Sequence, residues 1–147
     1  MSKLELRHLS PDQDFDLFRE AHNWRTMRSK RASGGQMPFE EFVEPNPDRV
    51  VMGLFNGEFL AAYMVKEYAP HYYDMHFTAK REAPREYLVA GGVQLTTWLI
   101  QNGAVEVSAI IVARNRALKA FLEDCGYTLD KELTFNNSPH TWLRYVA

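Results

Sequence analysis

The sequence predicts a single α/β domain in which helices cover both faces of a central mixed β-sheet. Residues 56–58, Asn-Gly-Glu, separate two apolar runs and therefore predict an antiparallel hairpin. Further along, an expected strand over 72–79, a helix over 84–101 and a strand over 105–112 follow one another. A strand–helix–strand crossover joins parallel neighbours, so the sheet must contain both kinds of pairing.

The bulk composition fits one globular domain spanning residues 1–147. Hydrophobic residues make up 46% and charged residues 24%, which argues against long disordered tracts. A net charge of −2 argues against binding to nucleic acid or to a membrane surface. The single cysteine, Cys125, excludes an internal disulfide and a multi-cysteine metal site. With no signal-peptide core and no apolar run of about 20 residues, we expect a cytoplasmic protein.

The N-terminal part is expected to form a strand, a long helix and a short helix. Residues 4–9 alternate apolar and polar side chains, as a half-buried strand does. Residues 10–13, Ser-Pro-Asp-Gln, predict a helix start with serine as N-cap and glutamine at the capping-box position. Apolar residues at helical spacing follow, until the glycine-containing segment 29–35 breaks the helix, and a short helix is expected over 38–43.

The rest of the chain predicts strands that alternate with two helices. The nearly continuous apolar run 105–112 is typical of a strand buried on both faces. Asn115 and Gly126 are suited to begin and end the second helix, and residues 136–139 are expected to connect the last two strands. The expected elements not yet named are strands over 50–55, 59–65, 127–135 and 141–146 and a helix over 115–125.

The order of these elements resembles the GCN5-related N-acetyltransferase (GNAT) fold, and the likeness covers essentially the whole chain. Its most specific segment is 112–127, VARNRALKAFLEDCGY, which looks like the family's helix that begins with asparagine after the buried strand and closes with Gly-aromatic. The resemblance implies an acyl-CoA-dependent enzyme in which Asn115 lies along the pantetheine arm of acetyl-CoA. The alternative is that Asn115 and Gly126 are simply the caps of an ordinary helix.

The sequence departs from the family's pattern at two positions. The family's pyrophosphate loop has the form Gln/Arg-x-x-Gly-x-Gly/Ala and should fall near 81–87, where this chain has no glycine. Glycine lets a backbone curl tightly around an anion, and Pro84 removes one further N–H donor. Many members also have a tyrosine, which protonates the leaving thiolate, where this chain has Leu122.

Basic side chains occupy the segment in which the family's glycines are missing. Lys80, Arg81 and Arg85 surround the expected helix N-terminus, whose macrodipole favours anions. By the resemblance, Arg81 and Arg85 would hold the coenzyme's phosphates, while Phe77 and Thr78 would supply backbone contacts. The alternative is a solvated charged loop, neutralised for the most part by two nearby glutamates.

Two polar residues of the expected strand over 72–79 are candidates for the catalytic base. Asp74 and His76 share one face of that strand with Thr78, because side chains alternate along it. An enzyme that acylates amines needs a base to remove the ammonium proton, and the resemblance implies one at this place. Half-exposed strand residues that pair with their neighbours would explain them equally well. Glu67, near the end of the hairpin, is a weaker candidate.

Together these features favour a divergent N-acyltransferase that moves an acetyl group from acetyl-CoA to an amine. The alternative is a catalytically inactive GNAT-fold protein used for binding or assembly. Certain bacteriophage internal virion and morphogenesis proteins look like this, with the same weakened loop. The sequence names neither the acceptor amine nor the oligomeric state, and it leaves open a homodimer or another protein partner.

Overall fold

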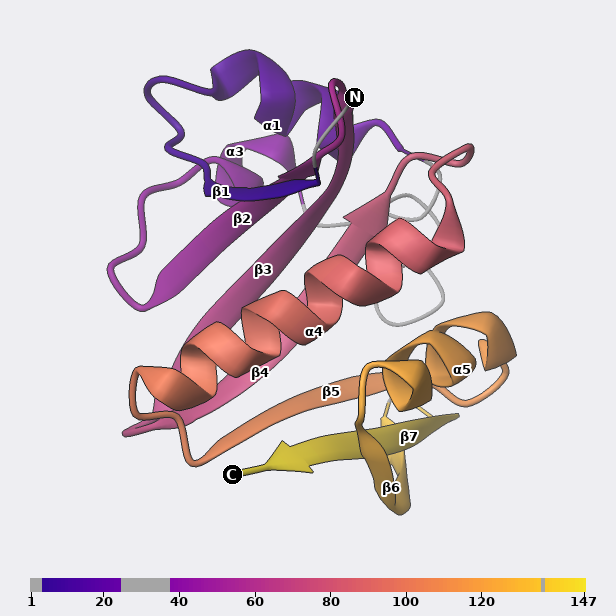
Figure 1. Cartoon of the computed structure of the whole chain (residues 1–147). Helices are drawn as coiled ribbons and strands as arrows, with labels where there is room; N and C mark the ends of the chain where they lie inside the picture. Colours follow the sequence, from indigo (N-terminus) through magenta and orange to yellow (C-terminus); the bar gives the residue numbers. More distant parts are fainter. Residues whose placement is uncertain (1–3, 25–37, 136) are drawn as a thin grey trace.

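The structure is a computed structural model that describes residues 4–24, 38–135 and 137–147 (Figure 1). The described residues form a seven-stranded sheet of order β1-β2-β3-β4-β5-β7-β6, in which β4 and β5 are parallel and the other neighbours antiparallel. The strands are β1 (Glu5–His8), β2 (Arg49–Phe55), β3 (Phe59–Ala69), β4 (Tyr72–Ala79), β5 (Glu106–Val112), β6 (Thr128–Phe135) and β7 (Ser138–Val146). The helices are α1 (Phe15–His22), α3 (Phe39–Phe42), α4 (Arg85–Gln101) and α5 (Arg116–Asp124). The expected helix break at 29–35 lies outside the described residues.

Helices lie on both faces of the sheet, as predicted, and the alternation along β3 shows how. Ala61 and Tyr63 belong to the larger core, which α4 and α5 cover, while Ala62 and Met64 belong to a smaller core under α1 and α3. Figure 1 shows α4 and α5 on the near side of the sheet. Both faces of β3 are therefore buried. No helix among the described residues is long and apolar enough to cross a membrane.

The hairpin and the crossover are confirmed. The backbone N–H of Asn56 donates to the carbonyl of Glu58 across the turn between β2 and β3. The strand β4 has the expected bounds, 72–79, and Pro84 occupies the N-cap position of α4. The predicted parallel neighbours, β4 and β5, are adjacent and parallel.

The expected start of the first helix is wrong by about one turn. Residues 11–13 form a turn, and α1 begins only after Asp14. Asp14 donates its N–H to the carbonyl of Ser10 (2.7 Å), and its Oδ2 accepts the N–H of Ser10 (2.9 Å). The Asp14 carboxylate also pairs with Arg7 of β1. Because these reciprocal bonds close a loop, Ser10 no longer acts as an N-cap.

Two expectations about the C-terminal strands also need correction. The strand β5 is not buried on both faces, because 44% of Ile110 is exposed to solvent. Within the described residues, α4 and α5 cover one face of β5, while α1 and α3 lie over β2 and β3. The last strand begins at Ser138, so the connection between β6 and β7 is shorter than the expected 136–139.

Candidate functional site

The two parallel strands at the centre of the sheet separate after a short contact. The ladder between them joins Tyr72–Asp74 of β4 to Glu106–Ser108 of β5 and goes no further along the described residues of either strand. In Figure 1 the two strands diverge toward the ends that lead into α4 and α5. Their facing edges are therefore not joined by ladder bonds, and backbone polar groups on such edges need other partners.

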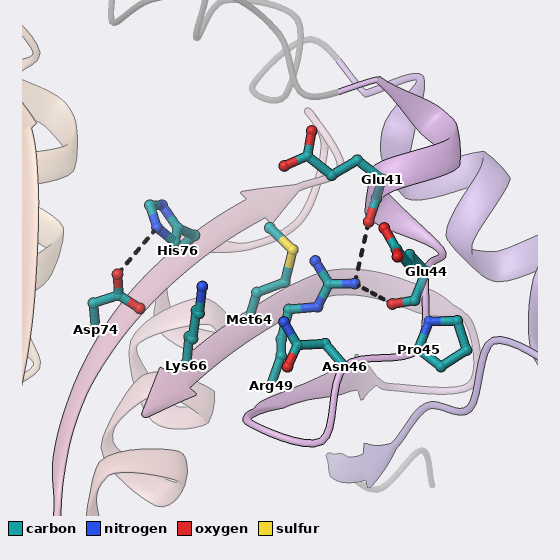
Figure 2. Close-up of a pocket in the computed structure, with 9 residues that line it drawn as sticks. All are labelled: Glu41, Glu44, Pro45, Asn46, Arg49, Met64, Lys66, Asp74 and His76. Atoms are coloured by element: carbon teal, nitrogen blue, oxygen red, sulfur yellow. Dashed lines mark hydrogen bonds and ion pairs between the residues drawn. The ribbon is translucent and has the colours of Figure 1, made fainter. Parts of the chain in front are cut away.

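A pocket of about 360 Å³ lies beside the separating end of β4, on the side of the sheet that carries α3 (Figure 2). A volume of this size lies within the range of small-molecule sites. Both predicted base candidates line this pocket. The lining residues are Glu41, Glu44, Pro45, Asn46, Arg49, Met64, Lys66, Asp74 and His76.

Asp74 and His76 lie next to each other on the wall that β4 provides, as the period-two pattern predicts. His76 Nε2 lies 3.7 Å from Asp74 Oδ2, and the two side chains are 49% and 38% exposed. Asp74 Oδ1 is buried and has no hydrogen-bond partner among the described residues. A buried carboxylate oxygen without a donor is costly, so this oxygen is suited to accept a hydrogen bond from a ligand.

Arg49 fixes the opposite wall of the pocket. Its Nη2 donates to the backbone carbonyls of Glu44 (2.7 Å), Phe42 (3.1 Å) and Glu41 (3.3 Å). These carbonyls lie at and just after the C-terminus of α3, where a helix leaves carbonyls without partners, although that of Glu41 also accepts the backbone N–H of Glu44. The guanidinium charge is thereby directed at backbone oxygens, while the carboxylates of Glu41 and Glu44 line the pocket (Figure 2).

The turn between β4 and α4 is fixed by contacts at its beginning, whereas its end has no side-chain cap for α4. The backbone N–H of Lys80 donates to the carbonyl of Leu60, and the Lys80 ammonium lies 3.5 Å from Glu58 of the hairpin. Arg81 is exposed and forms no ion pair within the described ranges. Pro84 provides no side-chain cap for α4, and the first N–H groups of a helix have no acceptor inside it. The turn thus presents N–H groups and a guanidinium to solvent.

Arg85 extends from the first turn of α4 to the end of α5. Its Nη2 lies 2.6 Å from Asp124 Oδ2, and both side chains are about half exposed, at 56% and 51%. Solvent screens such a pair, so it contributes between zero and about 1 kcal/mol to stability. Arg85 can therefore exchange Asp124 for another anion at small cost.

Comparison with solved structures places this architecture among the acetyltransferases. An N-acetyltransferase from Staphylococcus aureus superposes with a TM-score of 0.79 at 15% identity, covering 99% of this chain and 98% of the other. A chimera of the spermidine N-acetyltransferase SpeG from Vibrio cholerae with hSSAT superposes with a TM-score of 0.77 at 10% identity, covering 99% and 96%. An aminoglycoside acetyltransferase in complex with coenzyme A and kanamycin gives 0.75 at 12% identity, covering 98% and 95%.

The chain has the GNAT fold. No protein-family model matches the sequence, and no curated protein matches it significantly. The likeness therefore lies in the order and pairing of the elements rather than in shared residues.

Phe77 and Thr78 of β4 have their side chains in the interior of the protein. Phe77 stacks on Phe121 of α5, with ring centroids 4.6 Å apart, and packs against Tyr63. Thr78 is fully buried on the opposite face of β4. A ligand between the strands could reach these two residues only through their backbones, which is the kind of contact that the sequence analysis predicted for them.

Asn115 caps α5, which is the structural alternative from the sequence analysis. Its Oδ1 accepts the N–H of Leu118 at 3.1 Å. The amide nitrogen is not needed for the cap, and the side chain is exposed. Capping and ligand binding by Asn115 are thus compatible.

Two further residues of this region belong to the core. Leu122 is 1% exposed, so the position where many GNAT proteins carry tyrosine is closed to solvent here. Burial raises the pKa of the Cys125 thiol to about 12, which keeps it protonated and unreactive at neutral pH.

Glu67, the weaker base candidate, accepts the N–H of His71 in the turn between β3 and β4 and does not line the pocket.

The pocket residues contributed by α3, β2 and β3 were not predicted from the sequence. Lys66 lies directly opposite Asp74 in the β3–β4 ladder, and Met64 lies opposite His76. The alternation of β3 could have placed Lys66 and Met64 on one face. Nothing local could have placed Glu41 and Glu44 nearby, because they come from a helix that packs there through the tertiary fold.

Proposed function

We propose that this protein transfers an acyl group from an acyl-CoA to an amine. One observation carries the proposal: the strand that separates from its parallel neighbour ends in a cationic turn, and it also presents Asp74 and His76 to a pocket. A site for an anionic coenzyme and a site for a basic acceptor thus lie along one strand. The solved acetyltransferases with the same fold, one of them in complex with coenzyme A, support this assignment.

The coenzyme is assigned to the opening between β4 and β5. Its phosphates would meet the N-terminus of α4, with Arg81 and Arg85 in place of the absent glycines. Its pantetheine arm would run between the strands, in reach of the backbone of Phe77 and Thr78 and of the Asn115 amide. Arg85 would leave Asp124 for a phosphate oxygen.

The acceptor amine is assigned to the pocket in Figure 2. Glu41, Glu44 and Asp74 contribute three carboxylates to its lining, against the cations of Arg49 and Lys66. Because Arg49 already donates to three backbone carbonyls, the carboxylates remain available to attract a protonated amine.

The chemistry requires the amine to lose a proton before it attacks. Asp74 or His76 would take that proton, and the nitrogen lone pair would then form the C–N bond at the thioester carbonyl. Collapse of the tetrahedral intermediate breaks the C–S bond, sulfur leaves with the electron pair, and the nitrogen gives up its second proton to solvent to become the amide. A thiol pKa near the ~8.5 of cysteine makes departure as thiolate feasible. Leu122 cannot donate a proton, so solvent would protonate the thiolate.

Coenzyme binding is tested by thermal unfolding with acetyl-CoA. Binding to the folded state alone should raise the melting temperature, by mass action. The Arg85→Ala variant should show a smaller shift, whereas Arg7→Ala, which removes another exposed arginine paired with an aspartate, should behave as the unmodified protein. No shift at millimolar acetyl-CoA with the protein folded would instead favour a non-catalytic GNAT-fold protein.

Catalysis is tested with a panel of amines and a variant carrying both Asp74→Asn and His76→Gln. We expect the acetyl-transfer rate to fall at least ~10²-fold, while the thermal shift with acetyl-CoA is retained. The Glu67→Gln variant, changed outside the pocket, should keep its rate. Equal activity in the double variant would remove both residues from the site.

A further inference from the structure

The strand β3 contacts the segment between β4 and the first turn of α4 at both of its ends. At the beginning, the carbonyl of Leu60 accepts the backbone N–H of Lys80 at 2.8 Å. At the other end, the Tyr63 hydroxyl donates to the carbonyl of Leu88 at 2.7 Å. Because α4 begins at Arg85, Leu88 lies at the end of its first turn. One strand thus fixes both ends of the segment to which we assign the coenzyme's phosphates.

The Tyr63 side chain is itself fixed within the larger core. It is fully buried, and its ring lies against that of Phe77, directly opposite in the β3–β4 ladder, with ring centroids 5.2 Å apart. Phe77 in turn stacks on Phe121 of α5. Burial raises the pKa of the Tyr63 hydroxyl above its usual value, so the hydroxyl stays protonated and remains a donor. The hydrogen bond to Leu88 therefore comes from a side chain that is already held in place.

The close approach of Tyr63 to α4 depends on Gly91. This residue lies three positions after Leu88, on the same side of the helix, and a Cβ at Gly91 would lie 2.5 Å from the Tyr63 hydroxyl oxygen. Glycine inside a helix lowers its stability relative to alanine, because glycine loses more backbone freedom on folding. Alanine at this position would push the hydroxyl away from the Leu88 carbonyl. The helix thus has glycine where the hydrogen bond from β3 requires it.

The first turn of α4 has no side-chain cap to fix its position. Pro84 occupies the N-cap and offers no acceptor, and the preceding turn lacks the glycines that would wrap an anion closely. Backbone N–H groups and the Arg85 guanidinium hold an anion only at hydrogen-bond distances of about 2.7–3.2 Å. A displacement of this turn by about 1 Å would therefore break those bonds.

We propose that Tyr63 is a positioning residue for the coenzyme. It holds the first turn of α4 at the place where the N–H groups of the helix and Arg85 reach the phosphates. Tyr63 acts through the Leu88 carbonyl and not by contact with the coenzyme, since its side chain is fully buried beneath the helix. Because this role presupposes that acetyl-CoA binds at this turn, it rests on the proposed function.

A second buried tyrosine provides a matched control. The Tyr127 hydroxyl lies 2.8 Å from Thr96 Oγ1, further along the same helix, and Thr96 donates to the carbonyl of Gly92. Tyr127 is 2% exposed, so Tyr63→Phe and Tyr127→Phe each remove one buried hydroxyl that contacts α4. The two variants should therefore lose similar stability in thermal unfolding without coenzyme. Only the hydroxyl at the first turn should matter for the phosphates.

Calorimetric titration of acetyl-CoA into the whole chain and its variants tests this role. We expect the dissociation constant to rise about three- to tenfold in Tyr63→Phe, as the loss of one hydrogen bond produces, and to stay within about twofold in Tyr127→Phe. Gly91→Ala, which leaves Tyr63 in place, should also raise the dissociation constant. Its effect should be smaller in the Tyr63→Phe background, because the hydroxyl that it displaces is then absent. Circular dichroism verifies that each variant is folded.

Three results would overturn the role of Tyr63 while the proposed function stands. The dissociation constant of Tyr63→Phe could equal that of the unmodified protein. It could instead rise equally in both tyrosine variants, which would tie binding to the stability of the whole helix. Gly91→Ala could have its full effect without the Tyr63 hydroxyl. If the unmodified, folded protein binds no acetyl-CoA, the proposed function fails and the role of Tyr63 fails with it.

Discussion

The helices α4 and α5 begin at the same end of the sheet, after the two strands that separate, but their first turns differ. At the start of α5, Asn115 accepts the N–H of Leu118, so the chain satisfies its own helix end. At the start of α4, Pro84 offers no side-chain acceptor, and an arginine follows at once. The same strand-to-helix connection thus has a side-chain cap in α5 and none in α4. Changes in α5 should damage folding, and changes at the start of α4 should alter ligand binding.

The largest expected effect is a loss of folding stability in the Leu122→Tyr variant. Leu122 is 1% exposed on the buried side of α5, so a larger ring and its hydroxyl have no room there. Overpacking of this kind costs about 1–3 kcal/mol of unfolding free energy, which urea denaturation measures. Leu122→Met keeps the volume and should cost less. Unchanged stability in Leu122→Tyr would mean that α5 can accept a tyrosine at this position.

The glycines that follow the two helices should also differ in the stability that is lost when each is replaced by alanine. Gly103 after α4 and Gly126 after α5 both have φ near +100°, which side chains rarely adopt. A Cβ at Gly126 would lie 3.0 Å from a ring carbon of Tyr145, whereas one at Gly103 would approach no atom closer than 3.7 Å. Both alanine variants should lose about 1–2 kcal/mol, with Gly126→Ala the worse. The reverse order in denaturation midpoints would contradict the tighter packing of α5.

Asn115→Ala should destabilise the protein by about 1 kcal/mol, through loss of the cap. Asn115→Ser keeps a capping oxygen and should restore most of that stability, but it lacks the amide N–H groups. If Asn115 also binds the pantetheine arm, the serine variant should show a reduced thermal shift with acetyl-CoA. A serine variant with unmodified stability and an unmodified shift would leave Asn115 a cap only.

The smallest effect on stability is expected where Arg85 and Asp124 join the two helices. Removing an exposed pair costs between zero and about 1 kcal/mol, so Arg85→Ala and Asp124→Asn should both fold normally. Their responses to acetyl-CoA should be opposite. Arg85→Ala should weaken binding, and Asp124→Asn, which frees the arginine, should strengthen it by up to about fivefold at low salt. Calorimetric titration measures both, and equal binding in the two variants would remove Arg85 from the coenzyme site.

The sequence by itself determined the order of the strands and helices and the parallel pair at their centre. Local signals suffice for this: a hairpin turn places two antiparallel strands, and a crossover helix requires parallel neighbours. The period of two in β4 likewise placed Asp74 and His76 on one face, and the residue type of Asn115 predicted its cap. Each of these depends on residues a few positions apart.

Only the tertiary structure decided which distant residues complete the site and which surfaces stay open. Asp14 prevents the helix start expected at Ser10 through its reciprocal bonds with Ser10, and its carboxylate also pairs with Arg7 of β1. Likewise, Arg85 meets Asp124 because two helices pack side by side. The apolar run of β5 could not show that Ile110 is exposed, since apolarity states what a strand could bury and not which helices are present to cover it.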